Sequence, residues 1–209
     1  MSEITFGFAL CGSYCTFDEV IGEMRKIAEQ GYRLLPVMSE HAAGTDTRFG
    51  RASDFIWQIE DICGREVIRS IVGAEPIGPK RMADLMIVAP CTGNTLGKLA
   101  CGITDTAVTM AVKSCLRAGL PVVLAPATND ALAASAQNIG RLMNSKHIYF
   151  VPMRQDQPEK KPTSAVADFS LILPTALAAL QDRQIQPVWR RRPEIAENPE
   201  FTVEKIQVK

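Results

Sequence analysis

The chain has 209 residues, with 23 basic and 23 acidic side chains, so its formal net charge at neutral pH is zero. About 46% of the residues are hydrophobic, which is enough for one well-packed α/β domain but would make two full domains cramped. The balanced charge argues against a nucleic-acid-binding protein that relies on a broad basic face. No apolar run reaches the ~20 residues that a bilayer span needs, and the N-terminus has no secretory-signal pattern. We therefore expect a soluble cytoplasmic protein.

The six cysteines form no Cys-x-x-Cys pair, and the chain has two histidines, His41 and His147, that could join them in a metal site. Closed zinc sites use clustered Cys and His ligands at short spacings. The sequence therefore predicts reduced thiols and no metal. The cysteines are Cys11, Cys15, Cys63, Cys91, Cys101 and Cys115.

Hydrophobic periodicity predicts strands and helices in alternation. The first strand is expected at 5–10, followed by a helix that begins with a Thr16-x-x-Glu19 capping box and ends at Gly31. Further strands are expected at 32–38, 85–89, 121–125 and 148–151. Further helices are expected at about 53–63, 95–101, 105–118, 130–144 and 164–181. This rhythm is typical of a three-layer α/β fold with a mostly parallel sheet.

In such a sheet, ligands bind beyond the carboxyl ends of the strands. Four loops leave those ends, at 11–15, 39–51, 90–95 and 126–130, and all are rich in small polar residues. Gly12 and Ser13 suit a phosphate at a helix N-terminus, although an ordinary strand-to-helix turn explains them equally well. Ser39 lies at the same predicted edge and is either a second phosphate ligand or an exposed turn serine.

The loop at 39–51 also contains Arg48 and Arg51, which can bind a carboxylate through two hydrogen bonds or remain surface charges. In the third loop, Pro90 is expected to end the strand and Gly93 to free the backbone. Asn94 and Thr95 can then contact a polar planar ligand or cap the next helix.

The stretch PCTGNTLGKLACGITDTAVT at 90–109 resembles the Pro-Ala-Ser-Ala-Asn-Thr block of the flavoproteins that include the homo-oligomeric flavin-containing cysteine decarboxylases. The matching residues are Pro90, Asn94, Thr95, Lys98, Ala100, Gly102, Asp105 and Thr109. The turn at 125–129 is similar to the Pro-Ala-Met-Asn turn of that family, and Gly12-Ser13 to its first phosphate loop. The resemblance covers about residues 5–151.

This resemblance implies a Rossmann-like flavoprotein fold that binds FMN between the subunits of a homo-oligomer, either a trimer or a dodecamer. The implied cofactor-binding residues are Gly12, Ser13, Ser39, Pro90, Thr92, Asn94, Thr95, Thr109 and Asn129. We interpret residues 1–186 as one FMN-binding domain and residues 187–209 as a C-terminal tail.

The chain departs from the decarboxylases in two places. The segment at 70–85, where they carry a catalytic histidine, has none, and Thr128-Asn129-Asp130-Ala131-Leu132 replaces their Met-Asn-x-x-Met-Trp. Both departures argue against oxidative decarboxylation of a peptidyl cysteine. They leave three alternatives: a flavin-dependent component of an oxidoreductase, a non-catalytic partner of a dehydrogenase, or a stand-alone decarboxylase.

One branch of the family fits the sequence more fully, with similar motifs at 12–20, 45–50, 89–106, 151–164 and 184–188. It implies an oxidoreductase of sporulating bacteria that aromatises a small dicarboxylate in the mother cell, together with a separate nicotinamide-dependent dehydrogenase-like chain. Arg48, Arg51 and either Lys160 or Lys161 are then candidate carboxylate ligands. The two lysines lie in a charged loop at 153–162 that is either a flap over the site or solvated surface.

Overall fold

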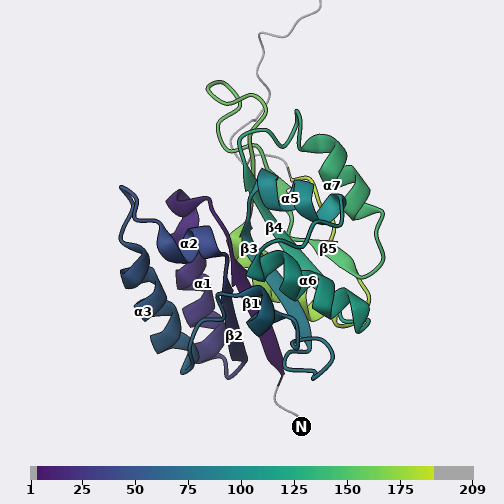
Figure 1. Ribbon diagram of the computed structural model, residues 1–209. Helices are drawn as coiled ribbons and strands as arrows, with labels where there is room; N and C mark the ends of the chain where they lie inside the picture. Colours follow the sequence, from purple (N-terminus) through teal and green to yellow (C-terminus); the bar gives the residue numbers. More distant parts are fainter. Residues whose placement is uncertain (1–3, 191–209) are drawn as a thin grey trace, which may run out of the picture.

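In the computed structural model, which describes residues 4–190, a seven-stranded sheet separates two layers of helices (Figure 1). Its parallel part has the order β2-β1-β3-β4-β5, and the strands β6 and β7 add an antiparallel edge to β4. This is the doubly wound order in which the chain moves outward from β1 in both directions. The strands are β1 Thr5–Leu10, β2 Arg33–Met38, β3 Leu85–Cys91, β4 Val122–Thr128, β5 Ile148–Phe150, β6 Met153–Arg154 and β7 Ala165–Ala167.

Two hydrophobic cores lie on the two faces of the sheet. The first contains residues of α1 Phe17–Glu29, α2 Glu40–Gly44, α3 Ala52–Cys63 and α8 Ile172–Ala179. The second contains residues of α4 Ile71–Ala74, α5 Gly93–Ala100, α6 Ala107–Arg117 and α7 Ala136–Met143. Figure 1 shows α1 and α3 on one side of the central strands and α5, α6 and α7 on the other.

Strand β1 shows how one short sequence serves both cores. Phe6, Phe8 and Leu10 pack into the first core, whereas Ala9 and Cys11 belong to the second. Successive side chains of a strand point to opposite faces, and a strand covered on both faces needs apolar residues at every position. Burial of both faces of β1 therefore explains the continuous apolar run from which this strand was predicted.

The predicted three-layer architecture with a mostly parallel sheet is confirmed. Of its expected parts, the helix at 130–144 begins only at Ala136, and the short helix α4 was not expected. The expected helix at 164–181 is instead strand β7, a 3-10 turn at Phe169–Leu171 and helix α8. Pro174 falls in the first turn of α8, where its missing N–H is not needed.

Three local expectations were wrong. The Thr16 side chain does not cap α1, because its hydroxyl donates to the Ser13 carbonyl oxygen at 2.8 Å. Strand β3 does not end at Pro90 but continues to Cys91. Its register with β4 shifts between Val88 and Cys91, and Pro90, which has no N–H to donate to a neighbouring strand, lies within this shift. The loop at 39–51 contains helix α2, whose N-cap is Ser39.

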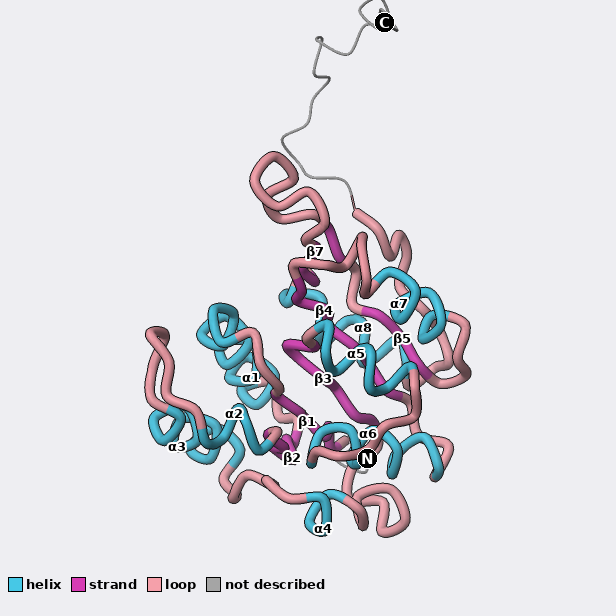
Figure 2. Tube along the Cα trace, turned by 45° about the horizontal axis from the view of Figure 1, so that its top comes forward, coloured by secondary structure: helices cyan, strands magenta, loops and turns pink. Residues whose placement is uncertain are grey.

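The charged stretch at 153–162 begins with strand β6, and residues 155–164 form the β6–β7 loop, which projects from the fold at the end where β4 finishes (Figure 2). The first residues of the predicted tail run beside β6, because the Met153 N–H donates to the Val188 carbonyl and the Arg190 N–H to the Met153 carbonyl. Residues 191–209 lie outside the described residues, so the tail remains a prediction. Among residues 4–190, no helix is long and apolar enough to cross a membrane.

Candidate functional site

A cavity of about 680 Å³ lies where strands β1, β3 and β4 end. Its volume is within the usual range for small-molecule and cofactor sites. We call it the carboxyl-end cavity. Its lining residues are Ser13, Cys15, Thr16, Arg48, Phe49, Thr92, Gly93, Asn94, Ala127, Thr128, Asn129, Asp130, Asp156, Lys161 and Val166.

The loop after β1 forms one wall. Ser13 adopts a left-handed conformation with φ 68° and ψ 47°, an uncommon one for a residue other than glycine. A Cβ atom on Gly12 would lie 3.3 Å from Thr92 Cγ2. Gly12 therefore lets the loops after β1 and β3 approach each other closely.

The turn after β3 forms the next part of the wall. Thr92 caps helix α5, with its hydroxyl oxygen accepting from the Thr95 N–H at 3.2 Å and its hydroxyl donating to Thr95 Oγ1 at 3.1 Å. Asn94 is exposed at the start of the helix and lines the cavity. The cap is thus satisfied within the protein, which leaves the Asn94 amide available to a ligand.

The Asp130 carboxylate stabilises the turn after β4 by accepting hydrogen bonds from two hydroxyl groups. Asp130 Oδ1 accepts from Thr128 Oγ1 at 2.5 Å and from Ser135 Oγ at 2.9 Å. A Cβ atom on Gly93 would lie 2.7 Å from both hydroxyl oxygens and 2.8 Å from Asp130 Oδ1. Since real Cβ atoms do not approach polar atoms this closely, the position requires glycine for the two turns to meet.

The β6–β7 loop closes the remaining side. The Thr163 hydroxyl donates to the Asn129 carbonyl oxygen at 2.7 Å, and the Leu132 N–H donates to the Thr163 carbonyl at 2.9 Å. Ser164 Oγ lies 3.4 Å from Asn129 Oδ1, as the donor. Asp156 and Lys161 of this loop line the cavity. Part of the segment that was predicted to be either a flap over the site or solvated surface therefore lines the cavity.

Two buried thiols lie beneath the cavity, at the ends of the neighbouring strands β1 and β3. The Cys11 thiol donates to the Pro90 carbonyl oxygen at 3.1 Å. A hydrogen bond from Cys91, assisted by Thr95 and Thr92, lowers the pKa of Cys11 to about 7 against the opposing effect of burial. Burial raises the pKa of Cys91 well above its ordinary value. Cys11 is therefore the thiol of this pair that ionises first.

The structure brings some of the predicted site residues to the cavity and leaves others outside it. Ser13, Arg48, Thr92, Asn94 and Asn129 line it. Gly12 lies behind the lining, against Thr92. The roles of all these residues remain predictions.

The other predicted residues form contacts within the protein. Ser39 caps α2 by accepting from the Ala42 N–H at 3.2 Å, and Thr109 forms a capping box with Thr106 at the start of α6. Pro90 and Thr95 are buried. Arg51 pairs with Asp54 at 3.1 Å, and its side chain is 74% exposed. These five residues do not line the carboxyl-end cavity.

Several residues of the lining had no ligand role predicted from the sequence. Cys15 and Thr16 belong to a loop that was expected to bind a ligand, as do Gly93, Thr128 and Asp130, so their place in the predicted loops was the available signal. Asp156 comes from the β6–β7 loop, and its position depends on the antiparallel pairing of two very short strands. No periodicity marks such a pairing.

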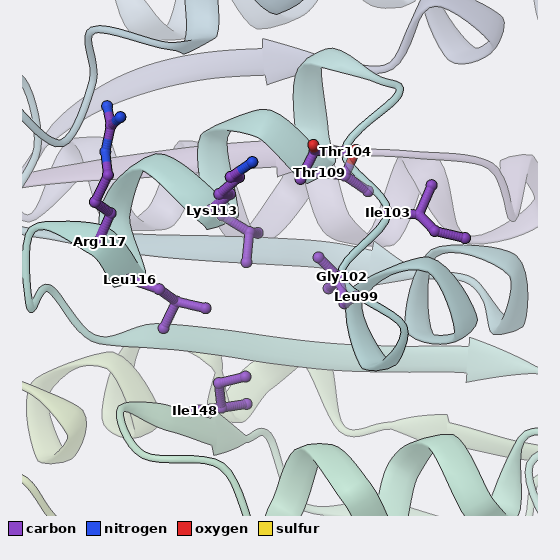
Figure 3. A pocket seen from close by; sticks show the side chains of 10 residues that line it. Leu99, Gly102, Ile103, Thr104, Thr109, Lys113, Leu116, Arg117 and Ile148 are labelled. Atoms are coloured by element: carbon purple, nitrogen blue, oxygen red, sulfur yellow. The ribbon is translucent and has the colours of Figure 1, made fainter.

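A second hollow of about 500 Å³ lies between α5, α6 and β5 (Figure 3). We call it the α5–α6 groove. Leu99, Leu116 and Ile148 border it, and the charged ends of Lys113 and Arg117 point away from Ile148. Thr109, one of the predicted cofactor ligands, lines this groove with its hydroxyl already bonded to Thr106. The groove is thus mainly apolar.

Comparisons of the chain with known proteins agree on one family. Residues 1–175 match the Flavoprotein family. The chain is 44% identical over 182 residues to the B subunit of dipicolinate synthase from Bacillus subtilis (strain 168), and the match covers 87% of this chain and 91% of the relative.

Solved structures agree with this result. The crystal structure of the dipicolinate synthase B subunit from Bacillus halodurans superposes with a TM-score of 0.83 and 43% identity, over 90% of this chain and 97% of that one. The structure of Burkholderia xenovorans DmrB in complex with FMN, described as a cubic protein cage for redox transfer, has a TM-score of 0.60 at 20% identity, over 77% and 93% of the two chains. At that identity the likeness concerns the fold alone.

Proposed function

Since this chain belongs to the Flavoprotein family, we propose that it is the flavoprotein B subunit of dipicolinate synthase and takes part in oxidising dihydrodipicolinate to dipicolinate during sporulation. The observation that carries the proposal is the combination of 44% identity with such a protein across most of both chains and a polar cavity at the carboxyl ends of the strands. The protein would act in the cytoplasm of the mother cell, where the dipicolinate would be made.

The chemistry of the cavity lining suits FMN. The lining contains hydroxyl and amide groups from Ser13, Thr16, Thr92, Asn94 and Asn129, which can bind a phosphate, ribityl hydroxyls and the polar edge of a flavin. No side chain caps helix α1, which begins at Phe17 after the 3-10 turn that follows Ser13. We propose that Ser13 holds the phosphate, while Thr92, Asn94 and Asn129 lie along the ribityl chain and the ring. When bound, FMN supplies an acceptor for the hydride equivalent that aromatisation removes from the substrate.

The substrate would be held by charge. Arg48 lines the cavity and stacks on Phe49, with its guanidinium carbon 4.8 Å from the ring centroid. Among residues 4–190 it has no carboxylate partner, so its guanidinium can bind a substrate carboxylate with two hydrogen bonds. Arg51, the second predicted carboxylate ligand, stays a prediction with weaker support because it pairs with Asp54.

The proposal includes partners. The A subunit of dipicolinate synthase, a nicotinamide-dependent dehydrogenase-like chain, would share the reaction, and the present chain would form a homo-oligomer, a trimer or a dodecamer. The name of the Bacillus subtilis relative supports a partner chain, and the cage described for the FMN-binding neighbour supports self-association. The absence of histidine from 70–85 disfavours a stand-alone decarboxylase.

The first experiment is the visible absorbance spectrum of the purified full chain, taken after adding FMN and removing the excess by gel filtration. A retained flavin band that dihydrodipicolinate bleaches under anaerobic conditions would support the proposal. Retained FMN that dihydrodipicolinate does not bleach, with or without the dehydrogenase-like partner, would contradict the oxidoreductase role. No retained flavin would favour a non-catalytic partner of that dehydrogenase-like chain, which co-purification of the two chains would then test.

A further inference from the structure

The ammonium group of Lys161 is a donor that the protein leaves without a hydrogen-bond acceptor. Lys161 lines the carboxyl-end cavity, and its side chain is 46% exposed. Its Nζ atom lies 3.8 Å from Asp156 Oδ2, which keeps the two charges together but is too long for a hydrogen bond. Among residues 4–190, Nζ forms no second ion pair and no hydrogen bond. An ammonium group has three N–H donors, so Lys161 can bind an anionic ligand while it stays beside Asp156.

The backbone of the β6–β7 loop holds Lys161 in place. The Lys161 N–H donates to the Gln157 carbonyl at 2.7 Å, and the Ser164 N–H donates to the Lys161 carbonyl at 3.0 Å. The Thr163 hydroxyl donates to the Asn129 carbonyl, in the turn after β4, at 2.7 Å. The backbone of Lys161 is therefore ordered before any ligand arrives, which lowers the entropic cost of binding.

The neighbouring Lys160 is an informative comparison, because the sequence left open which of the two lysines binds a carboxylate. Lys160 is exposed and does not line the cavity, whereas Lys161 does. The Lys160 N–H donates to the same Gln157 carbonyl, at 3.1 Å, so the two lysines belong to one turn. The structure therefore separates two adjacent residues of the same type and charge by their position relative to the cavity.

The charged groups that the cavity lining offers to a ligand are both cations. Of its two carboxylates, Asp130 already accepts hydrogen bonds from two hydroxyl groups, and Asp156 has one oxygen shielded from solvent and the other beside Lys161. The cations are Arg48, from the segment that follows β2, and Lys161, from the β6–β7 loop. In the sheet order, these two segments lie on opposite sides of β1, β3 and β4. A ligand with two separated anionic groups matches this arrangement.

We propose that Lys161 binds one carboxylate of the substrate while Arg48 binds the other, and that the two cations together select dicarboxylates over monocarboxylates. The inference rests on the proposed function and adds to it the residue that recognises the second carboxylate. Asp156 is a positioning residue, because its Oδ2 atom attracts the ammonium group without touching the ligand. A monocarboxylate with the same ring can use only one of the two cations at a time, so it always lacks one charged contact.

The test is isothermal titration calorimetry of the full chain, with and without saturating FMN, in buffer free of divalent cations. The ligands are dipicolinate and picolinate, which share a pyridine ring but carry two carboxylates and one. We expect the wild type to bind dipicolinate roughly ten-fold more tightly, as expected for one additional hydrogen bond to a charged group. Lys161→Met should weaken dipicolinate about ten-fold but picolinate only slightly, since a single carboxylate can still bind Arg48. The preference for the dicarboxylate is then lost.

Lys160→Met is the matched control and should leave both affinities unchanged, whereas Lys161→Arg keeps a cation at the position and should retain most of the preference. Equal weakening of the two ligands by Lys161→Met would assign the residue a structural role and overturn the inference. A wild type without a preference, or a Lys160→Met variant that loses it, would also overturn the inference. In these cases, bleaching of the flavin by dihydrodipicolinate, measured on the same preparation, decides separately whether the proposed function stands. If the wild type binds neither ligand, the inference and the proposed substrate class both fail.

Discussion

The carboxyl-end cavity and the α5–α6 groove are two hollows of similar size, and the cavity has the more polar lining. The cavity measures about 680 Å³ and the groove about 500 Å³. In the cavity, the Arg48 guanidinium and the exposed Asn94 amide are available to a ligand. In the groove, the Thr109 hydroxyl is hydrogen-bonded to Thr106 at the start of its helix, and the apolar lining includes Val112, Leu116 and Ile148.

The difference shows that volume alone does not identify a site for a polar anionic ligand. Open hydrogen-bonding groups that the protein itself leaves unsatisfied are the more informative feature, because each implies a partner of definite chemistry. The α5–α6 groove is bordered mainly by apolar side chains, with Lys113 and Arg117 pointing away from Ile148, and gives a weaker indication of a polar ligand. If the two hollows differ in this way, substitutions in them should have different consequences for ligand binding.

The largest effect is expected for Gly93→Ala. The added Cβ would be forced against Thr128, Asp130 and Ser135 at 2.7–2.8 Å, so these side chains must shift or the turns after β3 and β4 must separate. Overpacking of this kind costs about 1–3 kcal/mol, and if it falls on the bound state FMN affinity drops roughly ten- to hundred-fold. Fluorescence titration of FMN measures the loss.

Gly97→Ala is the matched control on the same helix. Its Cβ would meet Asn138 Nδ2 at an ordinary 3.5 Å, and alanine is about 0.5–1 kcal/mol better than glycine inside a helix. We expect unchanged FMN affinity and a slightly higher melting temperature. Equal losses in the two variants would mean that the close approach at Gly93 does not shape the cavity.

A smaller effect is expected for Arg48→Ala. Removing the cavity-lining guanidinium should weaken dipicolinate binding about ten-fold, as for loss of one charged hydrogen bond, with less loss at high salt because the exposed charge is screened. Arg51→Ala should change the affinity little, since Arg51 forms a surface ion pair with Asp54. Titration of the FMN-loaded variants at two salt concentrations separates the two arginines, and equal losses would contradict the distinction drawn between them.

The strands and turns that surround the cavity could be predicted from the sequence, because they are specified by local sequence patterns. The apolar runs at β1 and β3 and the glycines and hydroxyls after them specify strands that end at one edge. The sequence was less informative about which side chains line the cavity. Ser39 and Thr109 were predicted as ligands from their residue type and position, but the hydroxyl of each is bonded to backbone at a helix start.

The β6–β7 wall could not be derived in the same way. Its strands have two and three residues, too few for a periodic pattern, and the apolar sequence at 164–181 favoured a continuous helix. Pairing with Ala127 and Thr128 of β4 overrides that local preference. The position of Asp156 and Lys161 is therefore a property of the tertiary structure, and the sequence alone left this charged loop as either a flap or solvated surface.

A further test uses the cysteines as reporters of the cavity. Cys15 is exposed and lines it, whereas Cys101 is exposed elsewhere. Iodoacetamide should label both thiols in the free protein, and bound FMN should slow labelling of Cys15 several-fold without protecting Cys101, since reaction requires an accessible thiolate. Cys63 and Cys115 should stay unlabelled because burial raises the pKa of each to about 12. Peptide mass spectrometry reads each site, and equal protection of Cys15 and Cys101 would contradict the location of the cofactor.

The smallest effect is expected in the α5–α6 groove. Ile103 lines it and is 46% exposed, so Ile103→Ser removes apolar surface that the chain does not bury. The free energy of unfolding should change by no more than about 0.5 kcal/mol, and FMN affinity should match that of the wild type. Chemical denaturation and FMN titration of the same preparation measure both quantities. A clear loss of FMN affinity would show that the groove contributes to the cofactor site, across an interface between copies or through α5, and the separation between the two hollows would no longer hold.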